Sequence, residues 1–194
     1  MKKIVVLFAI IITIVGFIVW NGSFNSPQKS TNTFLKNIQK GNWKSASSYI
    51  KNSDAKEYFL EETQDKYNGF VFKKIKYEIG KIKKDDKQAS ISVKIIAIDK
   101  RKAQDIAFEK IRKEILEKDS IESHVVDTIP YVLKVVESPS AEKVTLPVKI
   151  KLVKVGDEWK VDLTEDFMDA LTGTYDRRTD KHIEFERIDS TDEK

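Results

Sequence analysis

The sequence predicts an α+β fold, in which helices open and close one domain and an antiparallel sheet lies between them. Two observations support this. Apolar residues recur at three- and four-residue intervals near both ends of the domain, whereas they alternate with polar residues in two long stretches between. Single glycines and short polar turns separate these segments. Helices and hairpins grouped in separate runs are typical of α+β domains.

The chain starts with a segment suited to crossing a membrane. After the basic start, residues 1–3, come 17 uncharged residues, Ile4–Trp20. As a helix this run would be about 25 Å long, which is near the lower limit for spanning a bilayer core. Lys2 and Lys3 favour a cytoplasmic amino terminus. We therefore expect a single-pass cell-membrane protein whose C-terminal domain is extracellular.

A cleaved signal peptide is the alternative interpretation of this segment, and it would make the protein secreted. Cleavage sites require small residues, whereas this segment ends in the large Trp20, which suits the membrane–water boundary. A retained transmembrane anchor is therefore favoured. The chain has no cysteine for a lipid or a disulfide, and this is typical of bacterial envelope domains rather than of eukaryotic secreted ones.

Behind the anchor we expect a linker at residues 21–31, one domain at 32–173 and a polar, flexible tail at 174–194. Three short helices are expected to open the domain, and the aromatic Trp43 in the second is expected to belong to the core. The first helix is expected to begin at Ser30 or Thr31 and to end at Gly41, and the second to begin at Asn42 and to end at Ile50. The third is expected to begin at Asp54 and to end near Gly69.

The alternating pattern then predicts a first hairpin. Its first strand is expected at Phe70–Lys84, where Gly80 interrupts the alternation and predicts a bulge. A turn at Asp85–Lys87 leads to a returning strand whose apolar face runs from Ala89 to Ala97.

A helical insertion is expected next. Lys100–Lys118 predicts an amphipathic helix, and a second helix over Ile121–Glu137 is limited by Pro130. The apolar face of the first helix is expected to contain Ala103, Ile106, Ala107, Ile111, Ile115 and Leu116.

The domain is expected to close with a second hairpin and a helix. Lys143–Val155 alternates like a strand, Gly156 makes the turn, and a last strand follows. Asp162 is expected to cap a helix that ends at Gly173. The tail contains a pattern for one short strand at His182–Ile188.

Several motifs in this order resemble a known family. The opening Lys40–Ala46, read with Phe34 and Leu35, is similar to the start of a group of bacterial envelope domains of unknown function. Val148–Leu163 is similar to the group's final hairpin and Phe167–Gly173 to its closing helix. This group resembles the nuclear transport factor two superfamily, with a cystatin-like, cone-shaped fold. The resemblance implies a bent antiparallel sheet wrapped around N-terminal helices and an envelope location, and it implies no reaction.

Catalytic and metal-binding motifs are weak in this chain. Relatives in the superfamily that are enzymes, isomerases and dehydratases, place an aspartate or histidine base and a tyrosine donor inside the cone. This directs attention to Tyr77 and Asp99. The simpler interpretation is that Tyr77 is a half-buried strand residue and Asp99 a helix cap. His124 and His182 are isolated, and no glycine-rich loop is present. Pairs such as Glu61-Glu62 and Asp85-Asp86 are expected to be solvated. We therefore assign no catalytic, cofactor or metal residues and expect no cofactor.

Charge is unevenly distributed along the chain, which carries a net charge of +4. Residues 70–118 contain 15 basic and 8 acidic side chains, whereas residues 157–194 contain 6 and 13. Two solvated faces are the favoured interpretation, and a basic surface for anionic lipids or wall polymers is the alternative. An extracellular location and the balancing acidic region disfavour nucleic acid as a partner.

These patterns lead to one main expectation about function. The chain is expected to be a membrane-anchored extracytoplasmic binding or interaction domain without catalytic activity. Its partners are expected to be the lipid bilayer, through the N-terminal helix, and either a small apolar ligand in the cone or a neighbouring envelope protein. The alternative is an envelope enzyme of the isomerase or hydrolase kind that uses a buried carboxylate.

Overall fold

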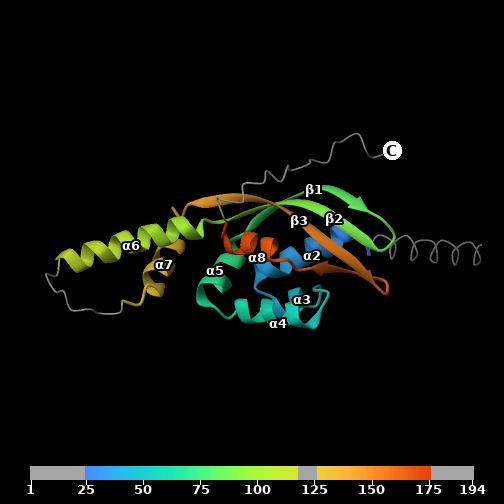
Figure 1. Cartoon of the computed structure of the whole chain (residues 1–194), viewed down its shortest axis with the longest axis horizontal. Helices are drawn as coiled ribbons and strands as arrows, with labels where there is room; N and C mark the ends of the chain where they lie inside the picture. Colours follow the sequence, from blue (N-terminus) through green and yellow to red (C-terminus); the bar gives the residue numbers. More distant parts are fainter. Residues whose placement is uncertain (1–24, 118–125, 176–194) are drawn as a thin grey trace, which may run out of the picture.

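The computed structural model describes residues 25–117 and 126–175. Over these residues the chain forms an open, four-stranded antiparallel sheet with helices α2–α8 (Figure 1). The expected α+β class with an antiparallel sheet is therefore confirmed. The expected anchor at 4–20 and the expected strand at 182–188 lie outside the described residues. Within them, no helix combines the length and the apolar character needed to cross a membrane.

The first helix, α2 (Pro27–Lys40), begins earlier than expected. The Ser26 hydroxyl accepts a hydrogen bond from the backbone N–H of Lys29, and Pro27 occupies the first turn. Serine followed by proline is a strong start signal, so Ser30 and Thr31 lie buried inside the helix instead of capping it. The helix ends at Gly41 in a left-handed conformation, as expected.

The next three helices differ more from the expectation. They are α3 (Trp43–Ser47), α4 (Ser53–Glu62, capped by Asn52 rather than Asp54) and α5 (Lys66–Lys74). The expected strand over Phe70–Lys74 is wrong, because Asp65 caps a helix there. Tyr67, Val71 and Ile75 are four residues apart, and this spacing places all three in the core.

The sheet contains β1 (Lys76–Lys84), β2 (Gln88–Ile98), β3 (Lys143–Val155) and β4 (Glu158–Asp162), in that spatial order. The register of β1 on β2 shifts between Ile79 and Ile82, which confirms the bulge expected at Gly80. The carboxylate of Asp85 accepts hydrogen bonds from the N–H groups of Lys87 and Gln88 and so forms the expected turn.

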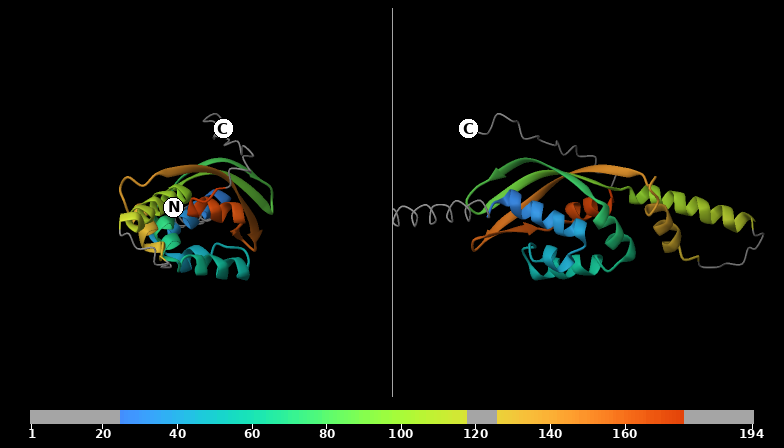
Figure 2. Two further views of the ribbon diagram at one scale, coloured as in Figure 1. Left: turned by 60° about the vertical axis from the view of Figure 1, so that its left-hand side comes forward. Right: turned by 180° about the vertical axis from the view of Figure 1, so that it is seen from behind.

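The sheet is bent, and helices α2 and α8 (Glu165–Thr172) lie on its concave side (Figures 1 and 2). Thr164 caps α8, whereas the expected cap, Asp162, is the last residue of β4. The concave faces of β2 and β3 carry the predicted apolar rows. These rows are Ala89, Ile91, Val93, Ile95 and Ala97 on β2, and Val144, Leu146, Val148, Ile150 and Leu152 on β3.

The connection between β2 and β3 forms a projecting arm, made of α6 (Lys100–Glu117) and α7 (Ile129–Val136). Figures 1 and 2 show α6 extending well beyond the end of the sheet, with α7 against its first half. Pro130 lies in the first turn of α7, so α7 begins later than the expected start at Ile121. Residues 118–125, including His124, lie outside the described residues.

Helix α2 runs antiparallel to β1, and this fixes the two ends of the domain. The Gln39 side chain donates to the carbonyl of Ile75 at 2.9 Å, and the Tyr77 hydroxyl donates to Oδ1 of Asn32 at 2.5 Å. The start of α2 therefore points toward the β1–β2 turn. The arm lies at the opposite end of the sheet (Figure 1).

Candidate functional site: the projecting arm

Aromatic rings fill the space between the bent sheet and the helices. Phe34, Phe59, Phe72 and Phe167 are all fully buried, and neighbouring ring centroids in this group lie 5.9 to 6.2 Å apart. Trp43 packs edge-on against Phe72, as expected for a core residue. The packing leaves the concave side occupied by the protein's own side chains at the spacing of a normal aromatic core.

Polar groups buried in this core are uncharged. Over residues 25–117 and 126–175 the buried polar side chains are Ser30, Thr31, Ser47, Thr63, Asn68, Ser92 and Thr172. A carboxylate facing an apolar cavity, which the enzyme alternative requires, is therefore not found in the described part of the chain. Burial does raise the pKa of one carboxyl group, Asp169 on α8, but its side chain is only half-buried and is not among these core groups.

Tyr77 and Asp99 occupy structural positions. Tyr77 is half-buried on β1; burial raises its pKa, and its hydroxyl is bonded to Asn32. Asp99 precedes α6, and its Oδ1 accepts a hydrogen bond from the N–H of Lys102 at 2.9 Å. The simpler interpretation of both residues, a strand aromatic and a helix cap, is confirmed.

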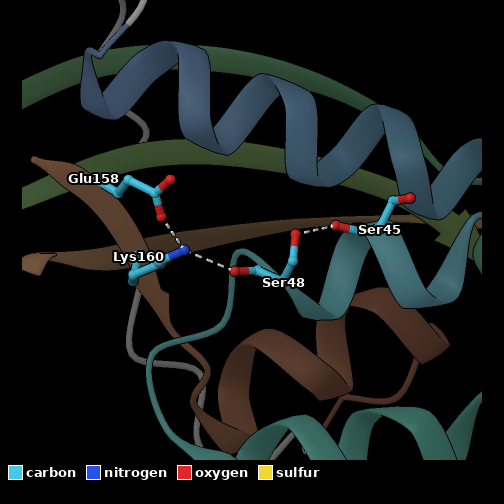
Figure 3. A network of polar contacts seen from close by, with 4 residues as sticks. All are labelled: Ser45, Ser48, Glu158 and Lys160. Carbon is cyan, nitrogen blue, oxygen red and sulfur yellow. Dashed lines mark hydrogen bonds and ion pairs between the residues drawn. The ribbon is translucent and has the colours of Figure 1, made fainter.

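A polar network joins β4 to the end of α3 (Figure 3). Lys160 forms an ion pair with Glu158 and donates to the carbonyl oxygen of Ser48 at 2.9 Å, while the Ser48 hydroxyl donates to the carbonyl of Ser45 at 2.8 Å. A serine nucleophile activated by lysine would need a neutral lysine amine within hydrogen-bond reach of the hydroxyl, to accept its proton. Here the ammonium contacts the carbonyl instead, so the network positions α3 against β4 and is not a catalytic pair.

The remaining polar candidates also have structural roles. Oε2 of Glu62 accepts from the side-chain amide of Asn68 at 2.6 Å, and the backbone N–H groups of the turn lower the pKa of Asp85. No group of three metal-binding side chains occurs among the described residues. His124 and His182 lie outside them.

A shallow polar pocket of about 350 Å³ lies at the base of the arm. Tyr67 forms part of its wall; burial, and to a lesser extent Asp99 and Asp65, raise its pKa. The ammonium of Lys100 lies 5.2 Å from the centre of the Tyr67 ring, a cation–π distance. The pocket is lined by Glu62, Asp65, Tyr67, Asn68, Lys100, Gln104, Thr128, Ile129 and Val132. Both signs of charge meet there, and the contacts fasten the arm to α5.

The arm itself exposes large apolar side chains. Phe108, Ile115, Leu116 and Ile129 are 54, 46, 73 and 50% exposed. The two other large apolar side chains that are comparably exposed on the described residues, Tyr58 and Val155, lie apart from each other on α4 and β3. Such a concentration of apolar groups on a projecting element is typical of an interaction surface.

The predicted apolar face of α6 is buried over the first part of the helix but exposed in its last turn. Ala103, Ala107 and Ile111 are buried, whereas Ile115 and Leu116 are exposed. The physical reason is that α6 extends past the sheet, so its last turns have little of the body to pack against (Figure 2). Phe108, a large aromatic among charged residues on the predicted polar face, was the one signal in the sequence for this surface.

The described basic residues of the stretch 70–118 come from several elements rather than from one helix or strand. These lysines and arginines are distributed over α5, β1, β2 and α6, and Lys94 on β2 is paired with Glu78 on β1 at 3.9 Å. This distribution favours solvated faces over a single polyanion site.

Comparisons of the chain with protein-family models, with curated proteins and with solved structures find no match. The functional interpretation therefore depends on the geometry of the arm and of the filled core.

Proposed function

We propose that this protein is a membrane-anchored, extracytoplasmic interaction domain without catalytic activity, which uses the α6–α7 arm to contact a neighbouring envelope protein. The observation that carries the proposal is the exposed apolar surface of the arm: Phe108, Ile115, Leu116 and Ile129. Burying apolar surface against a partner is favourable by about 25 cal/mol per Å². A protein partner is preferred to a small apolar ligand because aromatic rings already occupy the concave side of the sheet.

The orientation of the domain supports this role. The expected anchor ends at Trp20, and α2 begins at Pro27, so the connection of six residues spans at most about 20 Å. The start of α2 points toward the β1–β2 turn, and the arm lies at the other end of the sheet. The arm therefore lies at the end of the domain away from the anchor, where a second protein can reach it.

The proposal includes the cone-shaped fold of the nuclear transport factor two superfamily and a bacterial envelope location. Its support is the bent antiparallel sheet with α2 and α8 on the concave side, which agrees with the resemblance of the opening and closing motifs (Figure 2). Scaffolds of this kind serve many functions, so the fold adds no reaction to the proposal.

The first experiment tests the anchor. The full-length chain is produced in a bacterial host, membranes are washed with alkaline carbonate, and the intact mass is measured. We expect the protein to stay in the membrane with residues 1–20 retained and its domain accessible to protease added outside the cells. A mass that starts after Trp20, or a protected domain, would contradict this part.

The second experiment tests the arm. A photo-crosslinking amino acid replaces Phe108 in one variant and Tyr58 in a control variant, because these side chains are 54 and 48% exposed on different elements. We expect adducts with another envelope protein from position 108 and few from position 58. Equal labelling at both positions argues against the arm as the contact surface. Turnover of ester, lactone or steroid-like substrates by the full chain argues against a non-catalytic domain.

A further inference from the structure

Helix α6 carries a charge distribution that its own stability does not explain. Its first turn contains Lys100, Arg101 and Lys102 and no acidic residue, and its last turn contains Glu114 and Glu117 and no basic residue. The helix dipole favours the opposite arrangement, with acidic groups at the start and basic groups at the end. Cation–π contacts to Tyr67 and Tyr175 account for part of the basic turn, and Oε2 of Glu114 in the acidic turn accepts a hydrogen bond from the Tyr131 hydroxyl on α7 at 2.6 Å. These contacts leave the order of the charges along the helix unexplained.

Two of the three exposed large apolar side chains of α6, Phe108 and Ile115, lie on a coiled-coil seam, and Leu116 lies outside it. Gln104, Phe108, Ile111 and Ile115 follow one another at spacings of four, three and four residues, which places them along one stripe of the helix. Ile111 is buried at the inner border of this stripe, while Phe108 and Ile115 are about half exposed. A second helix laid along the stripe would cover both exposed side chains.

The charges beside this seam match an antiparallel copy of the same helix. Asp105 and Arg112 each follow a seam position, and they lie at equal distances on either side of the midpoint of α6. When two copies are related by a two-fold axis through that midpoint, Asp105 of one faces the partner's Arg112, and the reverse pair forms as well. The basic first turn then also lies near the acidic last turn of the second copy. A parallel copy would bring like charges together.

Arg112 is free to change partner at modest cost. Its guanidinium is 3.3 Å from Glu109 in the same helix, and both side chains are more than half exposed. Exposed pairs of this kind contribute little stability. The pair can therefore be exchanged for a contact across an interface.

We propose that the protein self-associates through α6, with the two helices antiparallel and packed along the seam of Gln104, Phe108, Ile111 and Ile115. This inference rests on the proposed function, whose partner it identifies as a second copy of the chain. One helix pair forms a small interface. Two copies whose long axes lie along the membrane plane can pair in this way with both anchors in one bilayer, which raises their effective concentration and favours the dimer.

The test uses the absence of cysteine from the chain. The full-length protein in membranes is prepared as Asp105→Cys, as Arg112→Cys and as the double variant, and it is then mildly oxidised. In the antiparallel dimer the cysteine at position 105 of one copy faces the cysteine at position 112 of the second copy. The double variant is therefore expected to form at least fivefold more disulfide-linked dimer than either single variant. In a single variant the two cysteines are offset by about 10 Å along the helix, seven residues at 1.5 Å each. Equal yields in all three variants, or no dimer in any, would overturn the proposal.

A charge exchange provides a second measurement that does not depend on oxidation. Asp105→Arg is expected to weaken self-association of the full chain in mild detergent by roughly fivefold, from the loss of two exposed pairs. The double variant Asp105→Arg with Arg112→Asp restores both pairs and should return the dimer. A double variant that stays as weak as the single one would contradict the register. Photo-crosslinks from position 108 to a different protein, without cysteine-linked dimers, would reject self-association and leave the proposed function standing.

Discussion

Replacing Gly173 by alanine is expected to destabilise the domain more than any other glycine replacement at a left-handed position. Gly173 ends α8 with φ of 72°, and its N–H bonds to the carbonyl of Ala170. A Cβ added there would lie 1.8 Å from the carbonyl oxygen of Ile98, where ordinary contact begins at 3.4 Å. The end of α8 and the end of β2 would therefore have to separate.

The magnitude follows from two contributions. A non-glycine residue in the left-handed conformation costs about 1–2 kcal/mol. The contact with the carbonyl of Ile98 adds overpacking, which costs about 1–3 kcal/mol, because Ala97 and Ile98 are themselves buried. We expect Gly173→Ala to lower the free energy of unfolding by about 3 kcal/mol or more. The matched control is Gly156→Ala, where φ is 60° and an added Cβ has nothing within 4 Å.

The assay is urea unfolding of the full-length chain in mild detergent, followed by tryptophan fluorescence. Gly156→Ala should lose about 1 kcal/mol, the conformational contribution alone. Gly173→Ala should lose at least twice as much, with the dependence of free energy on urea unchanged. Effects of independent mutations usually agree with additivity within about 0.5 kcal/mol. If the two losses of unfolding free energy differ by less than this, the close approach of α8 to β2 does not contribute and the reasoning is refuted.

Three further changes test the core, the arm and a perturbed carboxyl group. Phe34→Ala should cost about 3–5 kcal/mol of unfolding free energy, and added benzene should recover part of the loss by filling the cavity; no loss would mean the rings do not form the core. Ile111→Ala should cost about 2 kcal/mol or more and Ile115→Ala less than about 1 kcal/mol, because they are 8 and 46% exposed; the reverse order would reject the orientation of α6. Burial, and then the acidic first turn of α8, raise the pKa of Asp169. The stability that the protonated Asp169 contributes is therefore lost as pH rises through its folded pKa. Asp169→Asn should raise the melting temperature at about pH 7, and this gain should vanish at about pH 3, where the carboxyl group is protonated in both states. An equal gain at both pH values would contradict the direction of the pKa shift.

Much of the fold could be predicted because its signals are local. The alternation in Gln88–Ile98 and Lys143–Val155 predicts strands with one buried face. When these two strands pair, their apolar rows must lie on the same face of the sheet, and this restricts the register. Gly41 and Gly173 end helices because glycine tolerates the left-handed conformation. The sequence Asp85–Lys87 forms a turn through its own backbone N–H groups.

The residues from Tyr67 to Lys74 could not be assigned from local pattern alone. Tyr67, Val71 and Ile75 fit a helical spacing, while Val71, Lys73 and Ile75 also fit an alternating strand. Asp65 and the packing of α5 on α2 and α8 decide for the helix. The absence of a side chain at Gly69 also matters, because a Cβ there would lie 2.8 Å from the carbonyl oxygen of Thr63.

The candidate site shows the same division. The sequence alone predicted an amphipathic helix at Lys100–Lys118, Asp99 as its cap and a membrane anchor at Ile4–Trp20, because each of these depends on neighbouring residues. Only the tertiary structure decided which side chains of α6 are buried. Burial depends on where the body of the protein ends, and α6 projects beyond the end of the sheet (Figure 1). For this reason Phe108 and Ile115 are exposed on the arm, and the surface proposed for self-association becomes visible only in the folded chain.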